Sequence, residues 1–249
     1  MFDPLLLIII AGVFLLAGTV KGVIGLGLPT VSLGLLVLVT DLPGAMALML
    51  VPSFVTNFWQ GVVGGHLGAL LKRLWLFFTA ATASVWLGGE VLVRVDAHLL
   101  TALLGIVLMI YALISLRGVR LYVPSKHTTS LGVAAAGING VIGGMTGSFV
   151  VPGVMYLQAL GLDRHQLVQA MGILFTLSTL ALGLMLGGHG LLSVDLGGQS
   201  MAGVLPALLG MALGQRLRVR MSEERFRRVF FFAILDVGIA IAVRNLVIL

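Results

Sequence analysis

The chain has 249 residues, of which 59% are hydrophobic and only 10% are charged, with a mean hydropathy of +1.15. A soluble domain carries roughly 25% charged residues, so this composition excludes an ordinary cytosolic enzyme. The net charge of +6 would suggest nucleic-acid binding in a soluble protein, but in a membrane protein the positive-inside rule explains it. We therefore predict an all-α integral membrane protein that binds no nucleic acid.

The hydrophobic residues gather in eight stretches, which run 4–40, 45–65, 74–93, 97–116, 129–160, 166–187, 195–214 and 226–249. A membrane-spanning helix needs roughly 20 residues, so the first and fifth stretches are too long for one span. Each of them also carries a break rich in glycine and proline, at Gly22–Pro29 and at Gly140–Pro152. Because such clusters end helices, we predict that each long stretch forms a broken or re-entrant hairpin with two helical arms. The total is ten helical segments.

The breaks also indicate an internal repeat. Three short motifs recur in the same order at offsets of 118, 123 and 126 positions: Gly22-Val-Ile-Gly25 with Gly140-Val-Ile-Gly143, Gly64-Gly-His66 with Gly187-Gly-His189, and Leu87-Gly88 with Leu213-Gly214. We predict two transmembrane repeats, 1–117 and 129–249, joined by a cytoplasmic linker at 118–128. Each repeat is one broken hairpin followed by three spans.

The loop charges predict the topology. With the second hairpin entering and leaving on one side, nearly all loop cations lie on that side, and Arg94 alone lies opposite. These cations are Lys72, Arg73, Arg117, Arg120, Lys126, Arg164, Arg216, Arg218, Arg220, Arg225, Arg227 and Arg228. The positive-inside rule makes this side the cytoplasm, which places both termini outside, in the periplasm of a cell with an inner membrane. Since five segments per repeat is an odd number, the second repeat is inverted, as is typical of secondary transporters.

The glycine motifs carry a family resemblance that covers nearly the whole chain. Lys21-Gly-Val-Ile-Gly-Leu-Gly-Leu-Pro29 and Gly140-Val-Ile-Gly-Gly-Met-Thr-Gly-Ser-Phe-Val-Val-Pro152 resemble the two repeat motifs of the sulfite exporter TauE/SafE family, and Tyr156-Leu-Gln-Ala-Leu-Gly161 follows the second. The resemblance implies a permease for a small sulfur-containing anion such as sulfite, sulfoacetate or another organosulfonate, coupled to the proton gradient. Met145 and Thr146 stand where the family pattern leads us to expect more glycine, which leaves the substrate open.

The breaks themselves are candidate anion sites, because the start of a helix presents backbone N–H groups and partial positive charge. We expect the second arms to begin near Leu28–Thr30 and Thr146–Ser148. The candidate residues around the two breaks are Gly25, Gly27, Thr30, Gly144, Thr146 and Ser148. The alternative is that the glycines only allow helices to pack closely.

Two ionisable residues lie within spans, where such residues are functional candidates. Lys21 precedes the first break and can neutralise an anion; the alternative is a lysine that reaches the interface or pairs with an acid. Asn139 precedes Gly140 as Lys21 precedes Gly22, so we expect it at the equivalent place in a pseudo-symmetric pocket. Asp236 is predicted to be buried and is the candidate for proton coupling, with a structural pair to Arg244 as the alternative.

Polar stripes on two equivalent spans predict pocket walls. Ser53, Thr56, Asn57 and Gln60 share one helical face, and Gln169, Thr176 and Thr179 share another. We predict that Asn57, Gln60 and Thr176 contact the substrate; interhelical hydrogen bonding is the alternative.

The sequence therefore predicts a secondary transporter with partners that are a small anion, membrane lipids and protons, as a monomer or homodimer. We expect no cofactor and no metal, since His66 and His189 lack ligand-type neighbours. A carrier or channel for another carboxylate or inorganic anion is the alternative. An intramembrane enzyme is a further alternative, which the absence of hydrolase and nucleotide-binding motifs disfavours.

Overall fold

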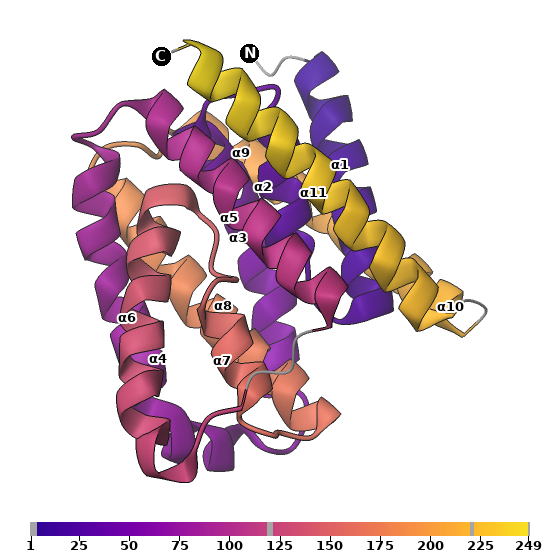
Figure 1. Ribbon diagram of the computed structural model, residues 1–249. Coiled ribbons are helices and arrows are strands. Elements are labelled where there is room, and N and C mark those ends of the chain that lie inside the picture. Colours follow the sequence, from indigo (N-terminus) through magenta and orange to yellow (C-terminus); the bar gives the residue numbers. More distant parts are fainter. Residues whose placement is uncertain (1–3, 119–121, 220–221, 249) are drawn as a thin grey trace.

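A computed structural model of the chain describes residues 4–118, 122–219 and 222–248 (Figure 1). Within these ranges the protein is helical and forms no strand. The helices are α1 (Pro4–Ile24), α2 (Leu28–Leu36), α3 (Leu42–Val62), α4 (Leu67–Leu92), α5 (Ala97–Arg117), α6 (Thr128–Thr146), α7 (Gly153–Ala159), α8 (Arg164–Gly188), α9 (Val194–Ala202), α10 (Val204–Arg218) and α11 (Glu223–Ile248), with a short 3₁₀ turn η1 (Ser125–His127). Each of the ten predicted segments is present, and the one at 195–214 is divided into α9 and α10.

Seven of the helical segments in the described part of the chain are long and apolar enough to cross a membrane, counting α9 and α10 together. The predicted all-α integral membrane fold is thereby confirmed. Of the predicted loop cations, Arg120 and Arg220 lie outside the described residues.

Side chains at the connections fix where several helices begin. Asp41 Oδ1 accepts a hydrogen bond from the Gly44 N–H at 2.8 Å, and Asp163 Oδ1 accepts one from Gln166 N–H at 2.9 Å. Ser193 caps α9 in the same way. These side chains satisfy backbone donors that the first turn of a helix leaves unpaired, so α3, α8 and α9 start at defined residues.

Both predicted hairpins are formed. The first arm α1 ends at Ile24 and the second arm α2 begins at Leu28, and Gly25 between them has φ of 85°. In the second hairpin Gly147 follows α6 with φ of 75°. The Gly25 and Gly147 N–H groups each donate to the carbonyl four residues earlier, Lys21 O and Gly143 O, at 2.7 Å. Glycine suits these left-handed helix ends because it has no Cβ.

Glycines in the first arms of the two hairpins make similar close contacts with neighbouring helices. The glycines that correspond in these contacts are not the ones that the repeated motif aligned. A methyl group at Gly22 in α1 would overlap the Met211 carbonyl and lie 2.9 Å from the Gly214 Cα in α10. A methyl group at Gly144 in α6 would likewise overlap the Val85 carbonyl and lie 2.9 Å from the Gly88 Cα in α4. The contacts therefore pair Gly22 with Gly144, and not with Gly140 as the Gly-Val-Ile-Gly motif predicted.

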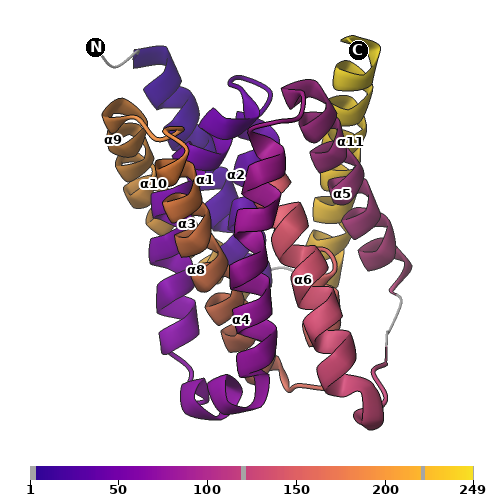
Figure 2. The same ribbon diagram turned by 90° about the vertical axis from the view of Figure 1, so that its left-hand side faces the viewer.

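The packing of the other long helices is antiparallel across the two halves of the chain. In α3 and α8, Gly61 approaches Gly172 while Leu50 lies beside Gly183. In α5 and α11, Gly105 approaches Gly238 while Tyr111 and Phe231 pack edge to face. The first turn of α1 and the last turn of α11 lie at the same end of the bundle (Figure 2). We call this the terminal end, and we call the opposite end, where α4, α6, α8 and α11 begin, the basic end.

Candidate functional site

A cavity of about 380 Å³ lies where α1, α3, α8 and α10 meet near the basic end. Its described lining includes a cluster of polar and cationic side chains: Lys21, Gln60, Arg164, His165, Gln169, Gln215 and Arg218. Gly22 and Gly25 of the first hairpin also line it. We call it the lysine cavity. Small-molecule sites commonly have volumes of roughly 300–1,000 Å³, so its size suits a small ligand.

Lys21 is only 3% exposed, and its ammonium contacts α3. The Nζ atom donates to Asn57 Oδ1 and, at 3.2 Å, to Thr56 Oγ1. The Thr56 hydroxyl in turn donates to the Pro52 carbonyl at 2.8 Å, which leaves its oxygen free to accept from Lys21. Both partners are neutral, so these contacts hold the lysine in place without cancelling its charge.

Two glutamines join α3 to α8 beside this cavity. Gln60 Nε2 donates to the Val168 carbonyl at 2.7 Å, and Gln169 Nε2 donates to the Gly61 carbonyl at 2.9 Å. Gln169 Oε1 also accepts from the His66 N–H at 3.0 Å. The amides therefore both line the cavity and fix the helices that form its wall.

A second cavity of about 820 Å³ lies on the other side of the first helix break, where Ile24 and Leu26 line it. Arg73 of α4, Arg164 of α8 and Arg227 of α11 line this cavity together, and we call it the arginine cavity. Its other polar lining residues include Tyr111, Ser115, Tyr122 and Gln158. The described lining residues include no aspartate or glutamate, so the cavity has a positive lining.

Most of the chain matches the sequence model of a known family. The model for the family described as "Sulfite exporter TauE/SafE" matches residues 10–241. The chain belongs to the sulfite exporter TauE/SafE family. No curated protein and no solved structure matches it. Family membership and the seven apolar helices together identify a multi-pass membrane protein of a family of sulfite-type anion transporters.

In this TauE/SafE chain the structure brings four of the sequence-predicted site residues together. Lys21, Gly25 and Gln60 line the lysine cavity, and Asn57 binds Lys21. Gly27 caps the start of α2 with φ of 106° and is not among the lining residues of either cavity.

The second break does not provide the predicted helix start. Thr146 is the last residue of α6, where its hydroxyl donates to the Ile142 carbonyl at 2.7 Å, and Ser148 lies in the connection. The second arm α7 begins only at Gly153, whose N–H donates to Asn139 Oδ1 at 3.0 Å. Asn139 thus ties the two arms together and is not equivalent to Lys21. The prediction of an arm that begins at 146–148 is wrong because six residues outside either helix, 147–152, separate α6 from α7.

Three other predicted residues are buried or partly buried away from both cavities. Gly144 packs against the backbone of α4, as the close-packing alternative expected. Thr176 donates its hydroxyl to the Gly172 carbonyl of its own helix at 2.6 Å. Thr30 is 3% exposed within α2.

Asp236 does not occupy the buried position that the sequence predicted. Its side chain is exposed on the outer surface of α11, and it lines neither cavity. The predicted partner Arg244 instead donates to the Leu38 carbonyl at 3.2 Å. The prediction of burial is wrong because the α11 face that packs on α5 is the one that carries Phe231 and Gly238.

Sequence reasoning missed the arginines as site residues. Arg73, Arg164 and Arg227 were interpreted as loop cations, yet each belongs to the first two turns of a helix. Cations are disfavoured near helix N-termini, so their placement there is the signal that could have identified them.

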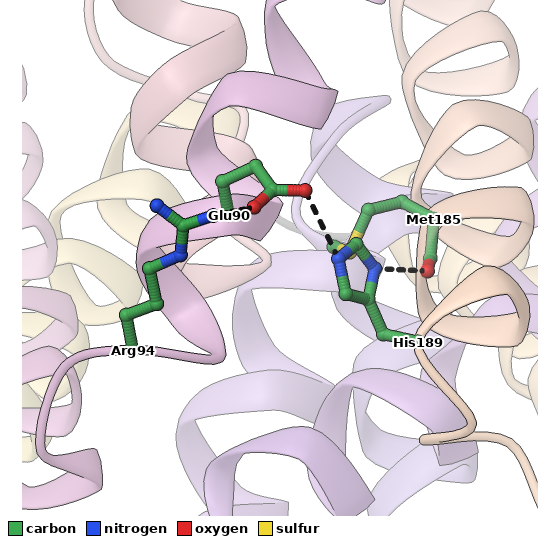
Figure 3. A network of polar contacts seen from close by, with 4 residues as sticks. All are labelled: Glu90, Arg94, Met185 and His189. Carbon is green, nitrogen blue, oxygen red and sulfur yellow. Dashed lines mark hydrogen bonds and ion pairs between the residues drawn. The ribbon is translucent and has the colours of Figure 1, made fainter.

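A polar network joins α4 to the residue that follows α8 at the terminal end (Figure 3). His189 Nε2 lies 3.3 Å from Glu90 Oε1, and Glu90 Oε2 pairs with Arg94 Nη2 at 2.7 Å. The second ring nitrogen of His189 lies 2.9 Å from the Met185 carbonyl oxygen. The hydrogen bond to Met185, and then the Glu90 carboxylate, raise the pKa of His189 above its ordinary value.

Proposed function

We propose that the chain is a secondary transporter that moves a small sulfur-containing anion, such as sulfite, sulfoacetate or another organosulfonate, across the membrane. One observation carries the proposal: the buried Lys21 ammonium lines a cavity at the first helix break and is held there by neutral oxygen acceptors. A buried cation without an acidic partner is costly, and an anionic ligand offsets that cost.

The surroundings of Lys21 favour an oxyanion as the ligand. Arg164, Arg218 and the amide of Gln60 line the same cavity, and the described lining contains no acidic residue. Guanidinium and amide N–H groups are the donors that oxyanions accept in proteins. The family name supports sulfite-type chemistry for the same site.

The proposed movement is alternating access, in which one hairpin-containing unit moves against the rest of the bundle. We propose that 1–117 and 129–249 are inverted repeats joined by the linker 118–128. Three observations support this arrangement: the matched contacts of Gly22 and Gly144, the antiparallel packing of α3 with α8, and the shared terminal end of α1 and α11. Inverted repeats are typical of secondary transporters.

We further propose that protons drive the transport, in a cell inner membrane with both termini outside. Asp236, on the exposed face of α11 at the middle of the helix, is the ionisable residue proposed for the coupling, because an acid within a membrane span is seldom kept without a function. The concentration of loop cations at the basic end supports a cytoplasmic location for that end.

The test is anion flux into proteoliposomes. Purified protein is reconstituted and supplied with radiolabelled sulfite or sulfoacetate, with and without an imposed pH gradient. We expect saturable flux that the pH gradient stimulates. Lys21→Met should abolish this flux, while Lys21→Arg should retain part of it.

Lys72→Met is the matched control, since Lys72 lies at the basic end but lines neither cavity. Its flux should equal that of the unchanged protein. Non-saturable flux would instead indicate a channel, and chemically altered label would indicate an enzyme. Wild-type flux in a well-folded Lys21→Met variant would refute the role of Lys21.

A further inference from the structure

The arginine cavity is lined by the kind of side chains that bind anions, and most of these side chains do not belong to the lysine cavity. Three guanidinium groups reach it from three helices, Arg73 from α4, Arg164 from α8 and Arg227 from α11. In the described part of the chain neither Arg73 nor Arg227 forms an ion pair. The three side chains are exposed to solvent, and their combined positive charge attracts anions to the cavity.

Tyr111 is a second, independent indication of a ligand. This residue lines the same cavity and is 1% exposed, and its buried hydroxyl has no hydrogen-bond partner among the described residues. Its ring is fixed by edge-to-face packing on Phe231, which also lines the cavity. A buried hydroxyl without a partner costs free energy, so an acceptor brought by a ligand would satisfy it.

The arginine cavity is distinct from the lysine cavity. The two share Arg164 and Val168 of α8, but Lys21 belongs only to the lysine cavity. The first helix break separates them, because Ile24 and Leu26 line one cavity while Gly25 lines the other. A ligand in the arginine cavity therefore lies on the other side of the break from Lys21.

We propose that the arginine cavity is a second anion-binding site, which takes a free dianionic oxyanion between Arg73, Arg164 and Arg227 with Tyr111 as a hydrogen-bond donor. Planar guanidinium groups bind oxyanions through paired N–H donors, and a lining with three of them favours a dianion over a monoanion. The volume of about 820 Å³ leaves room for a substituent on the oxyanion, such as the carboxylate arm of an organosulfonate. The site does not depend on the proposed transport, since it is defined by binding alone.

The test measures binding of ³⁵S-sulfate to the purified full-length protein in nanodiscs of phosphatidylcholine. The Lys21→Met background removes the buried cation of the lysine cavity, and Arg73 and Arg227 line only the arginine cavity, so their effect in this background reports on the second site. In that background we expect sulfate to bind, and Arg73→Gln with Arg227→Gln to weaken it by about tenfold or more. Tyr111→Phe should weaken it severalfold. Arg228→Gln is the matched control, because Arg228 lies on the same helix, pairs with Glu224 at 3.7 Å and does not line the cavity.

Sulfate binding that is absent in the Lys21→Met background, or unchanged in the double arginine variant, would overturn the proposal. Loss of binding when phosphatidylglycerol is added to the nanodiscs would also overturn it, since a lipid headgroup would then be the occupant. Thermal unfolding of each variant separates loss of the site from loss of the fold. If no anion is transported but sulfate binding still depends on the arginines, the transport proposal fails and this one stands.

Discussion

Lys21 in α1 donates one hydrogen bond from its buried ammonium to the side-chain oxygen of Asn57 in α3. An amide orients the ammonium without neutralising it, whereas a carboxylate at the same position would form an ion pair. The asparagine therefore leaves Lys21 without an acidic partner in the protein, so an anionic ligand in the lysine cavity can pair with it.

The first prediction follows from this pair. Asn57→Asp should pair with Lys21 and weaken anion binding by about tenfold or more, because the ligand then competes with a fixed carboxylate. The measurement is the KM of anion flux in proteoliposomes. Asn57→Ser is the matched control, since it retains an oxygen acceptor without adding charge and should change KM less. Equal KM values for the aspartate and serine variants would contradict the prediction.

The second prediction concerns the contact between α1 and α10. Gly22→Ala should destabilise the protein by about 1–3 kcal/mol, because the added methyl group would overlap the Met211 carbonyl. Gly12→Ala in the same helix is the control, since nothing lies within 4 Å of a methyl group there. Thermal unfolding in detergent should show a lower Tm for Gly22→Ala alone. Similar Tm values for both variants would show that α1 and α10 are less closely packed.

Much of the fold could be predicted from the sequence because hydrophobic length and helix-breaking residues are local signals. Each hairpin break contains a glycine at positive φ, Gly25 or Gly147, and both lie within the predicted ranges. The correspondence between residues of the two hairpins could not be predicted in the same way. Gly-Val-Ile-Gly recurs in a glycine-rich chain one turn away from the structurally equivalent position, and only the contacts of Gly22 and Gly144 reveal the difference.

Only some residues of the two cavities could be predicted from the sequence, because only some of them are unusual at their own position. Lys21 is identifiable because a lysine inside an apolar stretch is costly wherever it lies. The arginines at 73, 164 and 227 are each unfavourably placed near a helix N-terminus, but no local pattern predicts that three helices bring them to one cavity. Asp236 was wrongly predicted to be buried, because its position in the sequence does not say which face of α11 packs on α5.

The third prediction concerns the amide bridge between α3 and α8. Gln169→Leu should destabilise the protein by about 1–3 kcal/mol, since it leaves the buried Gly61 carbonyl and the His66 N–H without their partner. Gln166→Leu, one turn earlier on the same helix, is the control, because the hydrogen bond described for Gln166 comes from its backbone N–H and does not involve α3. The measurement is again Tm in detergent. A Gln169→Leu variant as stable as the control would show that the bridge contributes little.

The fourth prediction concerns pH and the contact of His189 with Glu90 at the terminal end. Because the folded structure raises the pKa of His189 above the ordinary value of about 6.5, protonation of the ring favours the folded state. This stabilisation is fully present below pH of about 6.5, and it is lost as the pH rises through the raised pKa. His189→Gln should therefore lower Tm more at a pH of about 5.5 than at about 8.5. Glu90→Gln should reduce the same pH dependence, since it removes the charge that faces the ring. An equal decrease in Tm at both pH values would show that the charge of His189 does not stabilise this end of the bundle.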